Sequence, residues 1–481
     1  MANVYHLTVL FGSLALLMAL VVRGKSIFVV APFCALLAIT LSGADPVATM
    51  NGAYMAGFAD YLRRFYLIFA LGAVFGKLME ESGAAITIAQ TVGKLLGKQR
   101  ACLAVVLACA LLTYGGVSLF VVGFSVYPLA LQLFRAADLP RRFIPAAIAF
   151  GSITFTMTSA GSPEIQNLIP IQYLVKETLI DGVVQRVPLT DARAGWPVSL
   201  LVANLMFCLG QWHLERVIRR AVANGERFEI RDQDKIAPDA HAKHRPGIVA
   251  SIAPLIVTLF ALNGLPTICH KIAEAKLFSD SSSPTVAVLH AILSRVPEDG
   301  TLSIFLGVMA GVIVLRLWLK DSWTCFGDGF VNGLLAVGST GAVVGFGAAV
   351  KELPAFQMVV TWVTHLPGHP LISAAIAIAI IAAIAGSASG GQGIAFPIIK
   401  PIYIDELGVA PRALHRVVAI ASGTLDSLPA NGYLVMLIRN ICGETHARAY
   451  GPIFVTTVLI PAVGTAIAIA LFKVHPTWAL M

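Results

Sequence analysis

Charged residues are scarce in this chain. They make up 12% of its 481 residues, whereas 57% are hydrophobic and the mean hydropathy is +0.81. A soluble globular domain carries about 25% charged residues. The composition therefore excludes an ordinary soluble domain and predicts a multi-pass membrane protein. The net charge of +8 does not indicate a nucleic-acid partner, because Lys and Arg are scattered among short loops.

Motifs of enzymes and of nucleotide sites are missing as well. The chain contains neither His-Glu-x-x-His nor Gly-x-Ser-x-Gly, and it has no Gly-x-x-x-x-Gly-Lys-Ser/Thr phosphate loop, so no enzyme, metal, cofactor or ATP site is expected. Seven cysteines, mostly within apolar stretches, favour small core residues over disulfides. Residues 1–22 lack a basic n-region, which predicts a retained first helix and not a cleaved signal.

Long apolar runs predict an all-α membrane protein with two halves of matching order. The candidate spans of the first half are 4–22, 26–43, 65–82, a Gly-interrupted pair at 101–133, a broken span at 141–175, and 195–220. The second half repeats this order at 247–264, 301–319, 328–350, 370–404, 412–442 and 451–472. The charged stretch 222–246 is a predicted cytoplasmic linker between a first repeat (1–221) and a second repeat (247–481).

The two interrupted pairs, 101–133 and 370–404, predict re-entrant hairpins. Residues 113–118 and 386–393 divide each pair into arms that are shorter than the roughly 20 helical residues needed to cross a bilayer. Each half then crosses the membrane five times, so the second repeat is predicted to be inverted. Lys and Arg are more frequent in the loops after odd-numbered crossings, which predicts that both termini lie outside.

Two polar interruptions are the strongest indication of function. They lie at 151–167 and 421–432, and aligning Ser152 with Ser422 brings them into register. Paired broken helices are typical of transporter sites, because freed amides and helix N-termini suit a carboxylate, whereas freed carbonyls and hydroxyls suit a cation. The candidate substrate-binding residues of the interruptions and hairpin tips are Ser118, Thr154, Thr156, Thr158, Ser159, Gly161, Ser162, Asn167, Ser389, Gly390, Gln392, Thr424, Ser427, Asn431 and Gly432. For any single hydroxyl, a bond to its own backbone or to a neighbouring helix is the alternative.

Two carboxylates, Glu164 and Asp426, are predicted to carry a coupling proton or to complete a sodium site. An ionised carboxylate inside a span costs on the order of 3 kcal/mol or more, so such acids are usually functional. The alternative is that each caps a half-helix. The charged residues near Lys77 and Lys351 are better explained by helix ends at the membrane interface. His415 could titrate near neutral pH, but a single His near a loop is usually incidental. No arginine falls in a predicted interruption, so backbone amides are expected to bind the substrate carboxylate.

The run 154–170 resembles the signature of the gluconate permease family, within the wider ion transporter superfamily of citrate and dicarboxylate carriers. The stretch 72–85 is similar to that family's first repeat, and the order of elements matches over nearly the whole chain. Related permeases often have Gln where this chain has Glu164, and a Pro-Gly step in place of Ala160-Gly161. The resemblance implies a symporter, proton-coupled or sometimes sodium-coupled, for small anions such as gluconate or hydroxybutyrate. It also implies a homodimer with a scaffold and an elevator-like transport domain.

Other classes stay open at this stage. A cation/proton antiporter uses the same acids without an organic substrate. A channel needs a continuous polar pore. Hairpins that meet at the midplane argue against such a pore. An intramembrane enzyme is the least favoured class, since its motifs are missing. The identity of the anion depends on how the broken helices pack.

Overall fold

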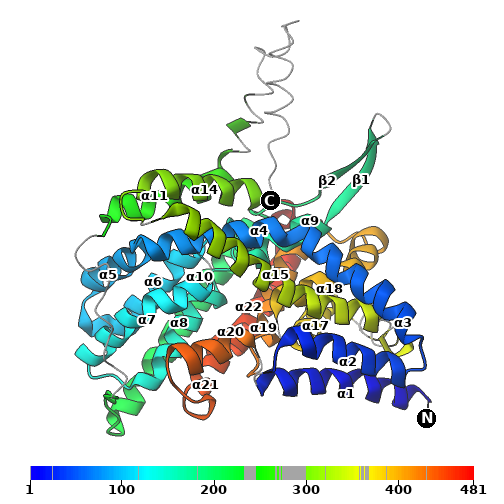
Figure 1. Ribbon diagram of the computed structural model, residues 1–481, viewed down its shortest axis with the longest axis horizontal. Coiled ribbons are helices and arrows are strands. Elements are labelled where there is room, and N and C mark those ends of the chain that lie inside the picture. Colours follow the sequence, from blue (N-terminus) through cyan, green and yellow to red (C-terminus); the bar gives the residue numbers. More distant parts are fainter. Residues whose placement is uncertain are drawn as a thin grey trace, which may run out of the picture.

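Helices make up nearly the whole of the computed structural model, as the hydrophobic runs predict (Figure 1). The structure describes residues 2–481 without 24, 118, 181–182, 232–244, 266–267, 270–271, 273–299, 320, 357, 359–361, 363–367, 386 and 430. The predicted all-α class is confirmed. The inverted relation of the halves and the re-entrant course of the hairpins stay predictions.

The first half contains ten helices and one β-hairpin within its described residues. The helices are α1 (Ala2–Val22), α2 (Ile27–Leu41), α3 (Pro46–Thr49), α4 (Met55–Glu81), α5 (Ala84–Leu96), α6 (Ala101–Tyr114), α7 (Leu119–Ala136), α8 (Ile144–Ala149), α9 (Ile165–Tyr173) and α10 (Trp196–Ala223). A π-helical turn at Met50–Tyr54 joins α3 to α4, and another at Phe150–Thr154 follows α8. Short 3-10 turns precede α6 (Lys98–Arg100) and α8 (Arg141–Phe143).

The β-hairpin lies where the sequence analysis expects only a loop. Its strands are β1 (Val175–Ile180) and β2 (Val183–Pro188), paired antiparallel with Val175 opposite Pro188. The segments are rich in Val, Thr and Ile, which favour strands. A second unpredicted element is α5, a short helix whose buried residues Ala84, Ala85, Ile88 and Ala89 lie on one face. Runs this short give a weak signal in sequence.

The second half follows the same order of elements. Its described helices are α11 (Ile248–Asn263), α14 (Gly300–Leu315), α15 (Ser322–Lys351), α17 (Pro370–Ala385), α18 (Ala388–Lys400), α19 (Pro411–Leu425), α20 (Gly432–Val435), α21 (His446–Phe454) and α22 (Ile460–Val474). The π-helical turns are Pro401–Glu406, Met436–Ile441 and Val455–Leu459, and a 3-10 turn at Pro476–Leu480 ends the chain. In both halves a long helix is followed by a pair of apolar helices and then by a broken helix.

Helix length and composition separate the described helices into two groups. Trp196–Ala223, Ser322–Lys351 and His446–Val474 are long and apolar enough to cross a membrane. Shorter apolar helices, of 10–17 residues each, include both members of the first predicted hairpin and the first member of the second. Short apolar helices need a protein partner at their ends, because backbone groups at membrane depth must be satisfied internally.

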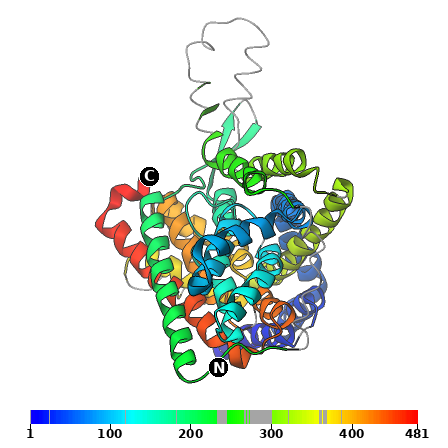
Figure 2. The ribbon, with the colours of Figure 1, turned by 90° about the vertical axis from the view of Figure 1, so that its left-hand side faces the viewer.

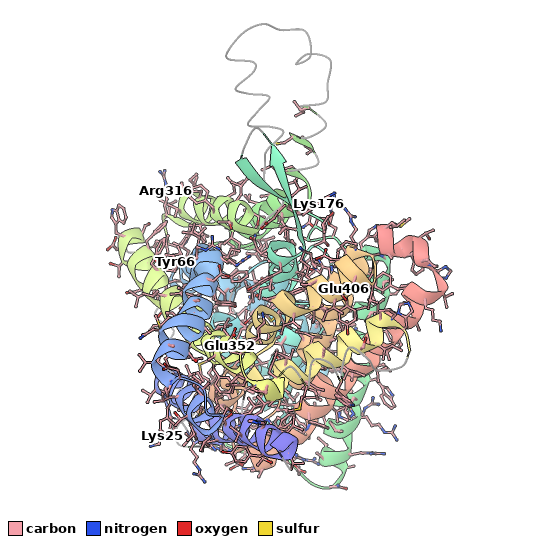
Figure 3. The ribbon with its side chains drawn as sticks, turned by 90° about the vertical axis from the view of Figure 1, so that its right-hand side faces the viewer. Lys25, Tyr66, Lys176, Arg316, Glu352 and Glu406 are labelled. Carbon is pink, nitrogen blue, oxygen red and sulfur yellow. The ribbon has the colours of Figure 1, made fainter. Side chains whose placement is uncertain are left out.

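The two long helices α4 and α15 pack with their backbones almost in contact (Figure 1). Glycines spaced four residues apart on α15 permit this approach. A Cβ at Gly333 would lie 2.4 Å from the Ala70 Cα, and one at Gly329 would lie 2.6 Å from the Val74 Cα. Small residues in such rows let membrane helices approach closely. Nearby, Tyr66 of α4, labelled in Figure 3, packs against an α15 ring with centroids 6.4 Å apart.

The remaining helices surround the two broken helices. α6 and α7 pack on α5 and α8, whereas α17 and α18 pack on each other and on α19. α9 contacts both α18 and α19, so the first broken helix meets the hairpin helices and the broken helix of the second half. Figure 2 shows α10 along the outer side of the molecule, beside α22.

Ion pairs gather one set of loops at the C-terminal end of α10. Arg142, before α8, pairs with Glu226 of the linker at 2.8 Å. Arg231 of the linker pairs with the buried Glu444, before α21, at 2.7 Å. The described part of the linker thus contacts the segments that precede α8 and α21. These loops are among those that the sequence analysis places in the cytoplasm.

A second set of loops gathers at the other end of α10. Arg412, at the start of α19, pairs with the buried Asp191 at 2.6 Å. The backbone amide of Gly195 donates to the carbonyl oxygen of the C-terminal Met481 at 2.9 Å. The loop 189–195, the start of α19 and the C-terminus therefore lie together.

Candidate functional site

The first break (155–164) precedes α9, and the second break (426–431) precedes α20. A cavity of about 300 Å³ lies where these breaks meet the N-terminus of α18 and the middle of α15. Polar residues that line it are Gln166, Ser339, Thr340, Ser387, Ser389, Asp426 and Asn431. Both halves of the chain therefore contribute polar groups to one small cavity. It is the kind of space that paired broken helices create in transporters.

A second cavity, of about 540 Å³, lies beside the first. Its polar lining includes Lys77 and Glu80 of α4, Asn332 of α15 and Glu164 of the first break. The two cavities share five apolar lining residues, which we call the septum: Phe69, Leu119, Met157, Ile165 and Ala336. The two predicted coupling acids therefore line different cavities that meet at the septum.

Glu164 is buried, with 8% of its surface exposed. It occupies the position before α9, where the backbone amide of Ile165, the first residue of that helix, interacts with its carboxylate. Lys77, in the same cavity, pairs with Glu81 at 2.9 Å and with Glu80 at 3.6 Å. Lys77 and Glu80 thus line a cavity, and their position is not explained by the membrane interface alone.

Asp426 is equally buried but is held by hydrogen bonds. Ser427 Oγ donates to its Oδ1 at 2.9 Å, and the backbone amide of Ala388 also interacts with its carboxylate. Ala388 is the first residue of α18, so Asp426 lies against the N-terminus of a helix that is distant in sequence. The capping alternative therefore has support for both acids, and Asp426 has a hydroxyl partner as well. A capping carboxylate that also faces a cavity still has an exposed route for a proton.

Four of the predicted hydroxyl groups donate to backbone carbonyl oxygens. Thr154, Thr156 and Thr424 donate to such oxygens at 3.1, 2.8 and 2.6 Å, and Ser159 does likewise. Ser162 instead accepts a backbone amide at 3.3 Å. The alternative reading, in which hydroxyls bond backbone groups of their own or a neighbouring segment, describes these five residues.

The two predicted asparagines close the loops of the breaks. Asn167 Nδ2 donates to the carbonyl oxygens of Ser162 and Ala192 at 2.8 and 2.9 Å. Asn431 Nδ2 donates to the Asp426 carbonyl at 3.1 Å, and its Oδ1 accepts the Leu434 amide at 3.0 Å. Both side chains satisfy backbone groups that the unwinding of a helix leaves without partners.

The tip of the second hairpin is shorter than predicted. Helix α18 begins at Ala388, so Ser389, Gly390 and Gln392 lie inside its first turns and not in an unwound segment. Gln392 is fully buried, and its Nε2 donates to the Gln166 carbonyl at 3.1 Å and to Ser422 Oγ at 2.8 Å. It thereby joins the hairpin to both broken helices. Gly432 starts α20, and Ser118 lies outside the described residues.

Gly161 is required by the shape of the first break. Its φ of +79° is a conformation that side chains rarely adopt, and a Cβ there would lie 2.9 Å from Asn263 Oδ1. Its carbonyl accepts the Asn263 amide at 3.0 Å, and the preceding Ala160 carbonyl accepts Tyr114 Oη at 2.6 Å. Donors from α6 and α11 thus hold the unwound backbone.

One arginine serves the first break although none falls within the predicted interruptions. Arg416, on α19, is completely buried and donates to the carbonyl oxygens of Thr158, Ala192 and Ala194, the last at 2.9 Å. Its side chain holds backbone in place and does not line either of the two cavities among the described residues. Sequence reasoning missed it because Arg416 lies about one turn into α19, outside the interruption at 421–432.

The neighbouring His415 is also central and not incidental. It is fully buried, with Nδ1 2.8 Å from Thr190 Oγ1 and Nε2 3.2 Å from Asn167 Oδ1. Sequence reasoning also missed Gln166, which lines the smaller cavity. The helical spacing of polar residues between 412 and 424 is the one signal that could have indicated an inward-facing polar side of α19.

Residues 5–474 match the family described as GntP family permease. A protein of Bacillus subtilis (strain 168), described as the uncharacterized transporter YxjC, is 34% identical to this chain over 96% of its length and 98% of the relative's length. The chain belongs to the GntP family of permeases. The resemblance seen in the sequence is thus confirmed. The protein is a transporter and not an enzyme, and it is a multi-pass protein of the bacterial inner membrane.

Two further likenesses are more limited. An uncharacterized transporter of Haemophilus influenzae is 43% identical over 84 residues, which are 18% of the permease and 20% of that relative. The solved structure of the YdaH transporter of Alcanivorax borkumensis aligns with 90% of each chain at a TM-score of 0.49 and 14% identity. A likeness of that degree carries no argument about this permease.

Proposed function

We propose that this permease is a secondary active symporter, which moves a small organic anion together with a cation, preferentially a proton. The observation that carries the proposal is the cavity of about 300 Å³, to which both breaks and the N-terminus of α18 contribute. Its size suits a small ligand, since pockets for small molecules begin near about 300 Å³. Family membership makes gluconate, hydroxybutyrate or another small carboxylate the first candidates.

Backbone amides carry the anion site in this proposal. The N-terminus of α18 faces the cavity at Ser387, Ala388 and Ser389, and a helix N-terminus favours negative charge. Asn431 and Gly432 contribute from the second break. Arg416 is bound to carbonyl oxygens, so the amides and the hydroxyl groups provide the electrostatic attraction.

Coupling follows from the presence of Asp426 in the same cavity. A bound carboxylate and an ionised Asp426 would place two negative charges in one small space, so the anion binds more tightly when Asp426 holds a proton. By the same linkage the anion favours proton binding. Glu164, across the septum, is the proposed second proton acceptor.

The movement that exposes this cavity to either side is proposed to be of the elevator type. The family resemblance implies a scaffold, a transport domain and a homodimer. The closely packed pair α4 and α15 suits the scaffold, and the two hairpins with the broken helices suit the moving domain. Inverted repeats at 1–221 and 247–481 would give the two states similar energies.

The first test is uptake of labelled gluconate and 3-hydroxybutyrate into proteoliposomes. An imposed inward proton gradient is compared with an inward sodium gradient. We expect uptake under the proton gradient. Uptake under the sodium gradient alone would support the sodium-coupled alternative. Absence of anion uptake by folded protein, with pH-dependent cation flux, would favour a cation/proton antiporter.

The second test separates the proton from the anion. Asp426→Asn cannot bind and release a proton but keeps a side chain of the same size. We expect it to abolish gradient-driven accumulation while anion exchange across the vesicle membrane continues. Accumulation equal to that of the unaltered permease would remove Asp426 from the coupling mechanism.

A further inference from the structure

Three buried side-chain oxygens near α19 have no hydrogen-bond partner among the described residues. They are Thr158 Oγ1 of the first break, Gln166 Oε1 of α9 and Gln392 Oε1 of α18. These residues are 2%, 6% and 0% exposed. Native proteins rarely keep buried polar atoms without a partner, because their desolvation is then uncompensated. The three oxygens therefore point to a ligand that accepts electron pairs.

The three side chains lie beside one step of α19, Ser422–Gly423. A Cβ at Gly423 would lie 3.7 Å from Gln166 Oε1 and 3.7 Å from the Thr158 methyl carbon Cγ2. Gln392 lies against the preceding residue, because its Nε2 donates to Ser422 Oγ at 2.8 Å. Side chains from three other segments therefore meet where Gly423 has no side chain of its own.

The amide orientation of Gln392 is determined by its partners. Its second bond runs to the backbone carbonyl oxygen of Gln166 at 3.1 Å, and a carbonyl can only accept. The nitrogen must therefore face that carbonyl, which leaves Oε1 as the atom without a partner. Gln166 Oε1 is likewise an acceptor only. Two acceptors and one hydroxyl oxygen suit a hard cation or a water molecule.

The surroundings favour a cation of single charge. Carbonyl and hydroxyl oxygens freed at broken helices are the usual ligands of sodium in transporters. A divalent ion of the calcium type requires carboxylate ligands, and none of these three groups is one. The buried guanidinium of Arg416, bonded to the Thr158 carbonyl, further disfavours a higher charge.

We propose that Thr158, Gln166 and Gln392 bind one sodium ion beside Gly423, at a site separate from Glu164 and Asp426. The inference rests on the proposed coupling of anion transport to a cation and names a second cation for it. Its ligands come from the first break, α9 and α18, and Gln166 also lines the anion cavity. Sodium binding therefore joins the pieces that form the anion site.

The test uses the purified full-length permease without any organic anion. Its melting temperature is measured while NaCl replaces choline chloride at constant ionic strength, with KCl as a parallel series. A ligand that binds only the folded state raises the melting temperature as its concentration rises. We expect a saturable rise with sodium that choline does not produce.

Two variants block the site while they preserve the fold. Gly423→Ala places a methyl group in the space at ordinary contact distance, 3.7 Å from its neighbours, inside a helix where Ala is favoured. Thr158→Val removes a hydroxyl that bonds no described residue and keeps the shape of the side chain. We expect each to weaken the apparent sodium affinity by at least about tenfold. Thr457→Val is the control, because that buried hydroxyl already bonds a backbone carbonyl at 2.9 Å.

The outcomes separate this inference from the proposed function. Loss of the sodium effect in both site variants, with the effect retained in Thr457→Val, supports the site. The same sodium effect in all four proteins would overturn it, since the ion would bind elsewhere. Absence of a sodium effect in the unaltered permease, together with proton-driven anion uptake, would also overturn the sodium site. The three oxygens would then be assigned to water molecules, and the proposed symport would still hold.

Discussion

The two breaks share a sequence pattern but are held in different ways. The first break spans 155–164, and Tyr114, Asn263 and Arg416 donate to its carbonyl oxygens from three distant helices. The second break spans 426–431 and bonds largely within itself through Asn431, with Tyr450 Oη adding a bond to the Ser427 carbonyl at 2.8 Å. An unwound segment at membrane depth must have its backbone satisfied by protein. The carbonyl oxygens of the longer break receive donors from distant helices. In the described part of the shorter break, Asn431 of the break itself and Tyr450 are the donors.

The two acids differ in what they join. Glu164 interacts with the backbone amide of Ile165, which is the next residue of its own segment. Asp426 accepts the Ser427 hydroxyl and interacts with the backbone amide of Ala388 in α18. Asp426 therefore links its break to the second hairpin, whereas Glu164 is held within its own segment.

The largest effect is expected from removing the main anchor of the first break. Arg416→Gln loses the charge and cannot reach the carbonyl oxygens of Thr158, Ala192 and Ala194 together. Hydrogen bonds to a buried charged donor are strong, so the free energy of unfolding should fall by on the order of 3 kcal/mol or more. Denaturant or thermal unfolding in detergent measures it.

Arg412→Gln is the matched control for Arg416→Gln. Arg412 lies on α19, as Arg416 does. The variant breaks the partly exposed ion pair of Arg412 with Asp191, which should cost about 1 kcal/mol. Equal losses in the two variants would contradict the idea that the first break depends on Arg416.

The next effect compares the acids. Asp426→Asn removes a negative charge from the N-terminus of α18 and should lower the free energy of unfolding by about 1 kcal/mol. Glu164→Gln keeps an oxygen that can accept the Ile165 amide and removes a buried carboxyl group that has no hydroxyl partner among the described residues, so stability should stay unchanged or rise. The melting temperatures of the two variants, measured side by side, check this order. A greater loss for Glu164→Gln would reverse our assignment of the two roles.

A smaller effect compares one tyrosine at each break. Tyr114→Phe and Tyr450→Phe each delete one hydroxyl bond to a carbonyl and should cost about 1 kcal/mol of stability. The effect on local opening of the two breaks should differ, because the first break keeps the hydrogen bonds from Asn263 and Arg416. Hydrogen exchange should accelerate more over 426–431 in Tyr450→Phe than over 155–164 in Tyr114→Phe. Equal acceleration would mean that the two breaks are held equally well.

The smallest effect concerns the attachment of α21 to the linker. Arg448 and Arg231 lower the pKa of the Glu229 carboxylate from its ordinary 4.5 to about 2. The ionised form is the one stabilised by folding, so this contact contributes fully above pH 4.5 and is lost as the pH falls toward 2. Glu229→Gln should flatten the acid side of the stability profile between these values. High salt should weaken the contact, because Glu229 is exposed.

Hydrophobic runs and polar interruptions were sufficient to predict the helices and to place both breaks, since these depend on local composition. Gly161 and Asp426 could be chosen for the same reason. The partners of the breaks could not be predicted, because Arg416 and Thr158 are 258 positions apart and meet only through packing. The start of α18 was misplaced because Ser and Gly residues are compatible with a loop, whereas Ser387 caps the helix and Gln392 is fixed by distant groups.

The septum has an electrical consequence. Only one layer of side chains, which includes the flexible Met157, separates the cavity of Glu164 from that of Asp426. In a state of the cycle in which the two cavities are hydrated and open to opposite sides of the membrane, most of the voltage falls across this layer. A charge that crosses the layer then gains or loses about 2.3 kcal/mol per 100 mV. Transport by this permease should therefore respond to membrane voltage whenever its cycle moves net charge past these five residues.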